Sequence, residues 1–395
     1  MGRHNAFTFP FTFFRQPAAQ VIPELQSYGF TGINLALNYH ASRDFLLRQG
    51  PALEYLADGF HYYQPNHDLY PEGAVTPHPK DTLLDNQLLD GVMHEANVRN
   101  FEVNAWAVFM HNSALGYQYP KLTVTNCFGN HFLSELCPSS REISGYISGL
   151  SADLCSRGIT SLAMESLHFH GAHHGEHHER FFLEMGEITA FLFSLCFCPS
   201  CIANFSGDGA ALKGRVATLL QPFLAEADPW LDVALTQENL ANIVGEELLL
   251  YLSAREQSIA ERYREVGAIA ARFGVRTKFV DQSPLISGSA GAPLAKSWQV
   301  GINNALIDSI VDIYEPLIYR TSAREVSEIA DHLRGELTSE ITAILRPTFP
   351  DNSSEESLTA KVKALREHSI TDIDFYLLDA MRPRDLSWIS RALTS

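Results

Sequence analysis

The sequence has 395 residues, of which 46% are hydrophobic and 19% are charged, a balance typical of a folded globular chain rather than a disordered one. Asp and Glu number 46 against 29 Lys and Arg, so the formal net charge is -17. This charge argues against a nucleic-acid partner and against anionic membrane surfaces. It favours a small neutral or cationic substrate.

The amino-terminal apolar stretch, 6–14, is short, rich in Phe and Thr, and interrupted by Pro10. It is better explained by a first β-strand than by a secretory signal. No run approaches 18 uninterrupted apolar residues, so we expect no membrane-spanning helix. Three of the six cysteines crowd into 196–201, which favours a metal or reduced thiols and hence the cytoplasm.

Continuous apolar runs alternate with amphipathic helical stretches along the whole chain. Runs of this kind are typical of parallel strands buried on both faces. Eight of them, alternating with helices, predict one α/β domain over 1–395, a (β/α)8 TIM barrel. The expected strands are 6–14, 31–38, 101–109, 160–166, 275–281, 310–318, 340–346 and 371–378.

A doubly wound open sheet is the alternative fold, but no GxGxxG turn follows the first strand. Helices are expected over 16–28, 84–99, 140–157, 322–335 and 355–368. The longest, 236–273, needs a partner surface for its apolar positions, either on the outside of the barrel or in a homo-oligomer interface. Two insertions, about 39–83 and 167–235, leave the carboxyl ends of the second and fourth strands, which is the catalytic face of such barrels.

Polar and aromatic side chains gather where the expected strands end. In a barrel these ends form one rim, so we expect a binding site there. Aromatic rings suit sugar stacking, and the arginines suit a carboxylate or an acidic sugar. The candidate substrate-binding residues are Asn38, Tyr39, His40, Trp106, His111, Asn112, His168, His170, Tyr319, Arg320 and Arg346.

Glu165 is the first candidate for catalysis because it ends the apolar run 159–164. Burial in an apolar cleft raises the pKa of a carboxyl group, which suits a general acid. Glycoside hydrolysis needs a second carboxylate across the scissile bond. Glu315, within an otherwise apolar strand, is the leading partner, and Asp281 is the next.

The segment 168–178 carries six of the 16 histidines. It offers imidazole and carboxylate ligands for a divalent metal, but it lacks the HExxH pattern that places two histidines on one helix face. Substrate hydrogen bonding and a structural loop are the alternatives.

The spacing Cys196-x-Cys198-x-x-Cys201 lets three thiolates converge on one tetrahedral ion, and zinc requires a fourth ligand. Cys137 is a candidate, with Cys127 and several histidines as competitors. A site with four protein ligands leaves no open position for water, so the expected zinc is structural. A turn of reduced, metal-free thiols is the alternative, and no organic cofactor is expected.

A lone upstream Cys, a Glu ending the fourth strand and a CxCxxC in the following loop together resemble the zinc-bearing β-galactosidases of thermophilic type. The matching region is 130–205. The resemblance implies a retaining TIM-barrel glycoside hydrolase, with Cys137, Cys196, Cys198 and Cys201 as zinc ligands and Glu165 as acid/base.

Two departures from that family pattern stand out. Met164 precedes Glu165 where the family has Asn. The family has its nucleophile Glu on the seventh strand, whereas the expected seventh strand of this chain ends in Arg346. A strand count in error by one would put Glu315 in the nucleophile position. Otherwise the catalytic pair spans the fourth and sixth strands.

The sequence therefore predicts a glycoside hydrolase acting on a small oligosaccharide or glycoside. One alternative is a metal-dependent sugar isomerase or epimerase, using His170, Glu165, Asp281 and Glu315 around one ion. The other is a carbohydrate-binding barrel without catalysis.

Overall fold

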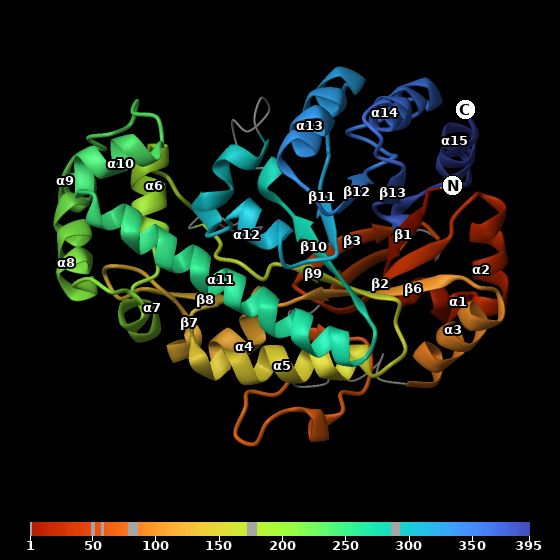
Figure 1. Ribbon diagram of the computed structural model, residues 1–395, viewed down its shortest axis with the longest axis horizontal. Coiled ribbons are helices and arrows are strands. Elements are labelled where there is room, and N and C mark those ends of the chain that lie inside the picture. The colour runs from red at the N-terminus through yellow and green to blue at the C-terminus, as the bar shows by residue number, and fades with distance from the viewer. Residues whose placement is uncertain (1, 49–51, 57–58, 78–85, 172–179, 286–292) are drawn as a thin grey trace.

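The computed structural model describes the whole chain except residues 1, 49–51, 57–58, 78–85, 172–179 and 286–292. Among the described residues, eight parallel strands pair edge to edge and close on themselves through β1 and β2 (Figure 1). The predicted TIM barrel is confirmed. In barrel order the strands are β1 (Asn5–Thr8), β2 (Gly32–Tyr39), β6 (Glu102–Val108), β9 (Ser161–Glu165), β10 (Arg276–Asp281), β11 (Ile313–Pro316), β12 (Glu340–Leu345) and β13 (Asp372–Phe375).

Each expected strand overlaps one barrel strand, and the largest difference is at the first. β1 ends at Thr8, and the chain then turns at Pro10 into the short helix α1 (Phe11–Arg15). Proline has no N–H to give to a strand ladder, which explains why the apolar run 6–14 divides there.

The helices cover the outside of the barrel. Six of them lie within the predicted ranges, and a seventh ends one residue beyond its range. The predicted helix 236–273 is broken at Gly245, whose φ of 113° is open mainly to glycine. Its long second part, α11 (Glu247–Arg272), packs against α5 (Arg141–Cys155), where Ser144 donates a hydrogen bond to Glu265 at 2.7 Å. The helices are α2 (Ala18–Ser27), α3 (Asn86–Val98), α5 (Arg141–Cys155), α10 (Gln237–Val244), α11 (Glu247–Arg272), α12 (Asn304–Asp308), α13 (Ala323–Glu336), α14 (Glu355–Glu367) and α15 (Pro383–Thr394).

Additional elements occupy three connections. After β2 come β3 (Ser42–Leu46), β4 (Ala52–Leu56) and β5 (Phe60–His61), and after β6 come α4 (Ser113–Gln118), β7 (Thr123–Thr125) and β8 (His131–Leu136). The segment after β9 holds α6 (Glu187–Ser194), α7 (Pro199–Asn204), α8 (Gly209–Leu219) and α9 (Gln221–Ala225). Figure 1 shows α6 to α10 gathered to one side of the barrel.

The barrel interior is polar on the side of the amino ends of the strands. Lys278 Nζ donates to Glu315 Oε1 at 2.9 Å and to Asp374 Oδ2 at 3.0 Å, and Asn34 also donates to Asp374 at 2.7 Å. Burial raises the pKa of Glu315 to about 8. Burial also acts to raise the pKa of Asp374, but Lys278 and hydrogen bonds hold it below its usual value. With Glu315 protonated, the trio of Lys278, Asp374 and Glu315 carries no net charge.

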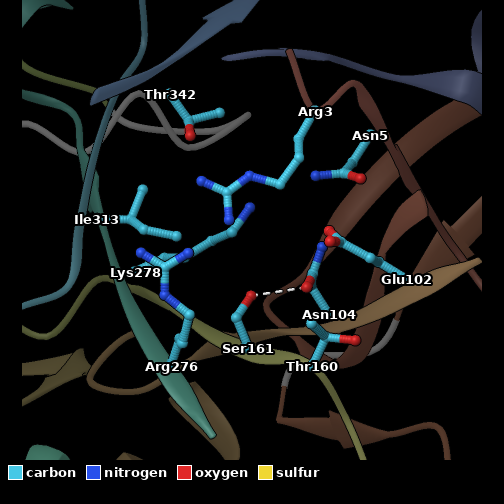
Figure 2. A pocket seen from close by; sticks show the side chains of 10 residues that line it. All are labelled: Arg3, Asn5, Glu102, Asn104, Thr160, Ser161, Arg276, Lys278, Ile313 and Thr342. Atoms are coloured by element: carbon cyan, nitrogen blue, oxygen red, sulfur yellow. Dashed lines mark hydrogen bonds between the residues drawn. The ribbon is translucent and has the colours of Figure 1, made fainter. Parts of the chain in front are cut away.

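A small pocket adjoins this trio at the amino ends of the strands (Figure 2). Ser161 donates a hydrogen bond to Asn104 across it at 2.7 Å. Arg276 forms an ion pair with Glu340 at 2.9 Å, and Arg3 also pairs with Glu340. The polar groups at this end are therefore largely paired with one another. The pocket is lined by Arg3, Asn5, Glu102, Asn104, Thr160, Ser161, Arg276, Lys278, Ile313 and Thr342.

No described helix is both long enough and apolar enough to cross a bilayer.

Candidate active site

A second pocket lies at the opposite end of the barrel, at the carboxyl ends of the strands. Its cavity volume is about 190 Å³. Each of the eight strands, or the turn that follows it, contributes to its wall. The lining residues are Phe7, Tyr39, Trp106, Glu165, Val280, Leu317, Tyr319, Arg346 and Tyr376.

Glu165 supplies the carboxyl group of this pocket. It ends β9 after three fully buried residues and is itself only 9% exposed. Trp106 Nε1 donates a hydrogen bond to Oε2, and Gln282 Nε2 donates to Oε1 at 2.8 Å. Burial raises the pKa of Glu165, although both hydrogen bonds favour the ionised form. The carboxyl is therefore fixed in orientation and retains its proton to a higher pH than a free Glu.

Aromatic rings surround the acid. Trp106 is 1% exposed and packs edge-on against Tyr39 and Phe7, with ring centroids 4.7 Å and 5.1 Å away. Its indole therefore serves as a donor to Glu165 rather than as an open stacking face. Tyr376 and Tyr319 are half-buried and leave ring surface for a ligand, as sugar-stacking sites require.

The two candidate arginines have different surroundings. The Arg346 guanidinium lies over the Tyr319 ring, 4.2 Å from its centroid, and lines the pocket. Arg320 donates to the backbone carbonyls of Tyr319, at 2.9 Å, and Pro284. Arg320 is thus occupied in fixing the loop after β11, and only Arg346 of this pair faces the pocket.

Four of the candidate histidines form a row beside the rim. The His40 ring stacks on His111 at 4.5 Å, His111 lies 5.8 Å from His170, and His168 stacks on His170 at 4.8 Å. His40 is close enough to Glu165 for a positive charge on its ring to favour the ionised carboxylate. The remainder of the His-rich segment, 172–179, lies outside the described residues.

The two candidate asparagines are engaged with the backbone. Asn38 bonds through its amide to both the N–H and the C=O of Val108, which joins β2 to β6. Asn112 caps α4 by accepting from the N–H of Leu115 at 2.9 Å. Both side chains support the rim instead of lining the pocket.

Glu315 is not in this pocket. On β11 it lies two residues below Leu317 on the same face, and Leu317 forms the pocket wall above it. Its side chain is fully buried against Lys278. The expectation that Glu165 and Glu315 face one cleft was wrong, because Glu315 lies deeper inside the barrel than Leu317, which forms the pocket wall.

Asp281 is also outside the pocket. Side chains alternate along a strand, and Val280 faces the pocket, so Asp281 faces the surrounding helices. It accepts hydrogen bonds from Ser283 N–H at 2.8 Å, Ser283 Oγ at 2.9 Å and Tyr314 Oη at 3.0 Å. Burial raises the pKa of Asp281 to about 6. Glu165 is therefore the only carboxylate among the described residues that line the pocket.

Four cysteines converge away from the pocket, between the end of β8 and the start of α7. The Sγ atom of Cys137 lies 3.5 Å from that of Cys201, 3.7 Å from that of Cys196 and 3.6 Å from that of Cys198. All four Sγ atoms lie within 4.8 Å of one another. Tetrahedral zinc with Zn–S bonds of about 2.3 Å separates its sulfurs by about 3.8 Å. The cluster has the composition and size for one such ion.

Three residues with clear structural roles were not among the sequence-based candidates. Gln282 follows directly after the predicted fifth strand, so its position at a strand end was a usable signal. Lys278 and Asp374 lie inside apolar runs and are 96 positions apart, so nothing in the sequence indicated that they pair.

The sequence matches no protein-family model and no curated protein. Among solved structures it is similar to the β-galactosidase of Marinomonas ef1, with a TM-score of 0.59 and 9% identity over 99% of this chain and 59% of that one. The β-galactosidase of Halorubrum lacusprofundi gives a TM-score of 0.59 and 11% identity, over 99% and 57%. An α-L-fucosidase of Paenibacillus thiaminolyticus gives 0.51 and 12%, over 100% and 49%.

These structural neighbours are TIM-barrel glycoside hydrolases. The chain has the barrel fold of these glycosidases. It spans less than two thirds of the length of each, and at 9–12% identity the likeness establishes the fold alone.

Proposed function

We propose that the protein cleaves a glycosidic bond of a small oligosaccharide or glycoside, with Glu165 as the general acid. The observation that carries the proposal is a buried carboxyl group, oriented by Trp106 and Gln282, in the wall of an aromatic pocket. The raised pKa of Glu165 keeps its proton available for the leaving oxygen.

The pocket has the character of a ligand site. Its lining is mostly apolar and aromatic, with Glu165 and Arg346 as the charged groups. Mostly apolar walls with a few fixed polar groups are usual for small-molecule pockets. Its place at the carboxyl ends of the strands is where barrel enzymes hold their active sites.

A second candidate is a carbohydrate-binding barrel without hydrolysis. It is favoured by one observation: among the described lining residues, no second carboxylate accompanies Glu165. The sugar isomerase is disfavoured, because Glu315 and Asp281 point into different regions of the molecule and cannot share an ion with Glu165.

Hydrolysis of a panel of nitrophenyl glycosides by the wild type and by Glu165→Gln tests the proposal. The matched control is Glu328→Gln, whose side chain on α13 is 50% exposed and does not line the pocket. Turnover that is lost in Glu165→Gln and kept in the control supports a glycosidase. Saccharide binding without turnover of any glycoside supports the second candidate.

We also propose that Cys137, Cys196, Cys198 and Cys201 hold a structural zinc ion. Four buried thiol groups whose Sγ atoms all lie within 4.8 Å of one another support it. Elemental analysis of protein purified without added metal should give close to one equivalent of zinc. Less than about a tenth of an equivalent, together with freely titratable thiols, would contradict the proposal.

A further inference from the structure

The wall of the active-site pocket is positively charged, unlike the molecule as a whole. Its described lining contains one guanidinium, Arg346, and one carboxyl, Glu165. When Glu165 carries its proton, as a general acid must, this lining has a charge of +1, whereas the chain has a formal charge of -17. A cation in the wall of a pocket favours a ligand that brings a counter-charge when it displaces water.

Arg346 is held in place but has unused hydrogen-bonding capacity. Its nearest carboxylate among the described residues is that of Asp351, with Nη1 to Oδ2 at 3.6 Å. That is longer than the 2.7–2.9 Å of a charge-assisted hydrogen bond. By comparison, Arg48 and Arg157 meet their carboxylates at 2.6 Å and 2.7 Å.

The Tyr319 ring limits the side from which a ligand can reach Arg346. Arg346 Cζ lies over this ring, 4.2 Å from its centroid, so a ligand reaches the N–H groups from the side away from the ring. The Arg346 side chain is 26% exposed. This is a pre-oriented fork of the kind that binds a carboxylate through two parallel hydrogen bonds.

The chemistry of glycoside cleavage points the same way. Its transition state carries positive charge on the sugar ring. A guanidinium in the same pocket opposes that charge unless the substrate itself supplies an anion. A neutral sugar would therefore meet repulsion, whereas a sugar with its own carboxylate would neutralise Arg346.

We infer that the substrate is an acidic sugar, a uronic acid or its glycoside, whose carboxylate pairs with Arg346. The inference rests on the proposed carbohydrate pocket and deepens it by naming the substrate class. It departs from the neutral or cationic substrate expected from the net charge of -17, because the pocket selects an anion locally within a chain that is acidic overall.

Calorimetric titration of Glu165→Gln with glucuronate against glucose, and galacturonate against galactose, tests the inference without turnover. We expect each uronate to bind at least about tenfold more tightly than its neutral counterpart, the usual worth of one charged hydrogen-bonded pair. The preference should fall as salt is added. Equal or tighter binding of the neutral sugars would overturn the inference.

Substitutions at position 346 assign the effect to one side chain. In the Glu165→Gln background, Arg346→Met should remove the preference and Arg346→Lys should keep part of it. Arg324→Met, at a side chain 82% exposed on α13, should leave it unchanged. Circular dichroism melting establishes that each variant is folded. A preference that survives Arg346→Met, or the absence of any saccharide binding, would refute the inference.

These titrations, combined with turnover assays, separate this inference from the proposed hydrolysis. Uronate binding that depends on Arg346, combined with no turnover of nitrophenyl glucuronides or galacturonides by the wild type, would support the substrate class and refute the glycosidase. Turnover of neutral glycosides that is unaffected by Arg346→Met would do the reverse.

Discussion

The indole Nε1 of Trp106, on the third barrel strand, donates a hydrogen bond to Oε2 of Glu165, on the fourth. The bond favours the ionised carboxylate, whereas burial favours the protonated one. The acidity of Glu165 is therefore a balance between its desolvation and the donors that its neighbours supply.

Removal of this donor should shift the pH profile. In Trp106→Phe the pKa of Glu165 should rise further, so the alkaline limb of kcat/KM should move to higher pH. Gln282→Leu, which removes the donor to Oε1, should shift the limb in the same direction. A limb that moves to lower pH in both variants would show that another group controls it.

Loss of the acid itself should depend on the leaving group. Glu165→Gln should lower kcat by about 10²–10⁴-fold for alkyl glycosides, the usual contribution of a general acid. Aryl glycosides with acidic phenols need less protonation and should lose less. A uniform loss across a series of phenols would argue that Glu165 binds the substrate without donating a proton.

The buried ion pair in the barrel interior should be essential for stability. Lys278→Met leaves Asp374 ionised and without its main partner, at a site with no exposure. Breaking one partner of a buried pair typically costs about 3–5 kcal/mol. Urea unfolding measures this cost, and Lys363→Met, at an exposed position of α14, is the control. A similar small change in both variants would contradict the role given to Lys278.

Glu315 should make stability depend on pH. Its pKa is raised from 4.5 to about 8 in the folded chain, so between these values the unfolded chain releases a proton that the folded chain keeps. The stability that protonated Glu315 contributes at low pH is therefore lost progressively as the pH rises from about 4.5 to about 8. Above about pH 8 none of this contribution remains. Glu315→Gln cannot titrate, so its stability relative to the wild type should increase across this pH range. Urea unfolding at about pH 5, 7 and 9 measures the difference, and a constant difference would contradict the assignment.

Arg255 should stabilise the cysteine cluster. It is 3% exposed on α11, and its Nε and Nη1 have no hydrogen-bond partner among the described residues. A zinc ion with four thiolates has a net charge of about -2, and Cys201 lies in the same small cavity as Arg255. We expect Arg255→Met to lose zinc to a chelator faster than the wild type, with Arg255→Lys intermediate. Zinc release followed with a metal-sensitive dye tests this, and unchanged release would refute it.

The strands and the thiol cluster were predictable because each depends on a local pattern. Apolar runs mark the barrel strands, and the spacing within 196–201 brings three sulfurs together whatever surrounds them. The position of Glu165 at the end of such a run also led correctly to the pocket wall.

The second carboxylate could not be predicted in this way. Glu315 and Asp281 also lie near the ends of apolar runs, but a run does not reveal which face a side chain takes or how deep it lies. Asp281 follows Val280 directly, so its side chain points to the opposite side of the strand, toward the helices. Glu315 lies on the inner side, but deeper in the barrel than the pocket wall, where it contacts Lys278. These outcomes depend on the register between strands, which is set by residues distant in the chain.

Cys137 and Cys196 are 59 positions apart, and β9 with Glu165 lies between them in the chain. An ion held by the four thiolates would close this segment into a ring, as a cross-link does. A single cut by a protease anywhere inside the ring would then leave both pieces tethered, and the nicked protein would migrate as one body until the metal was removed. Ring closure also limits how far the strand that carries Glu165 can separate from its neighbours during transient opening, because the unfolded arrangements of a closed loop are fewer than those of a free one.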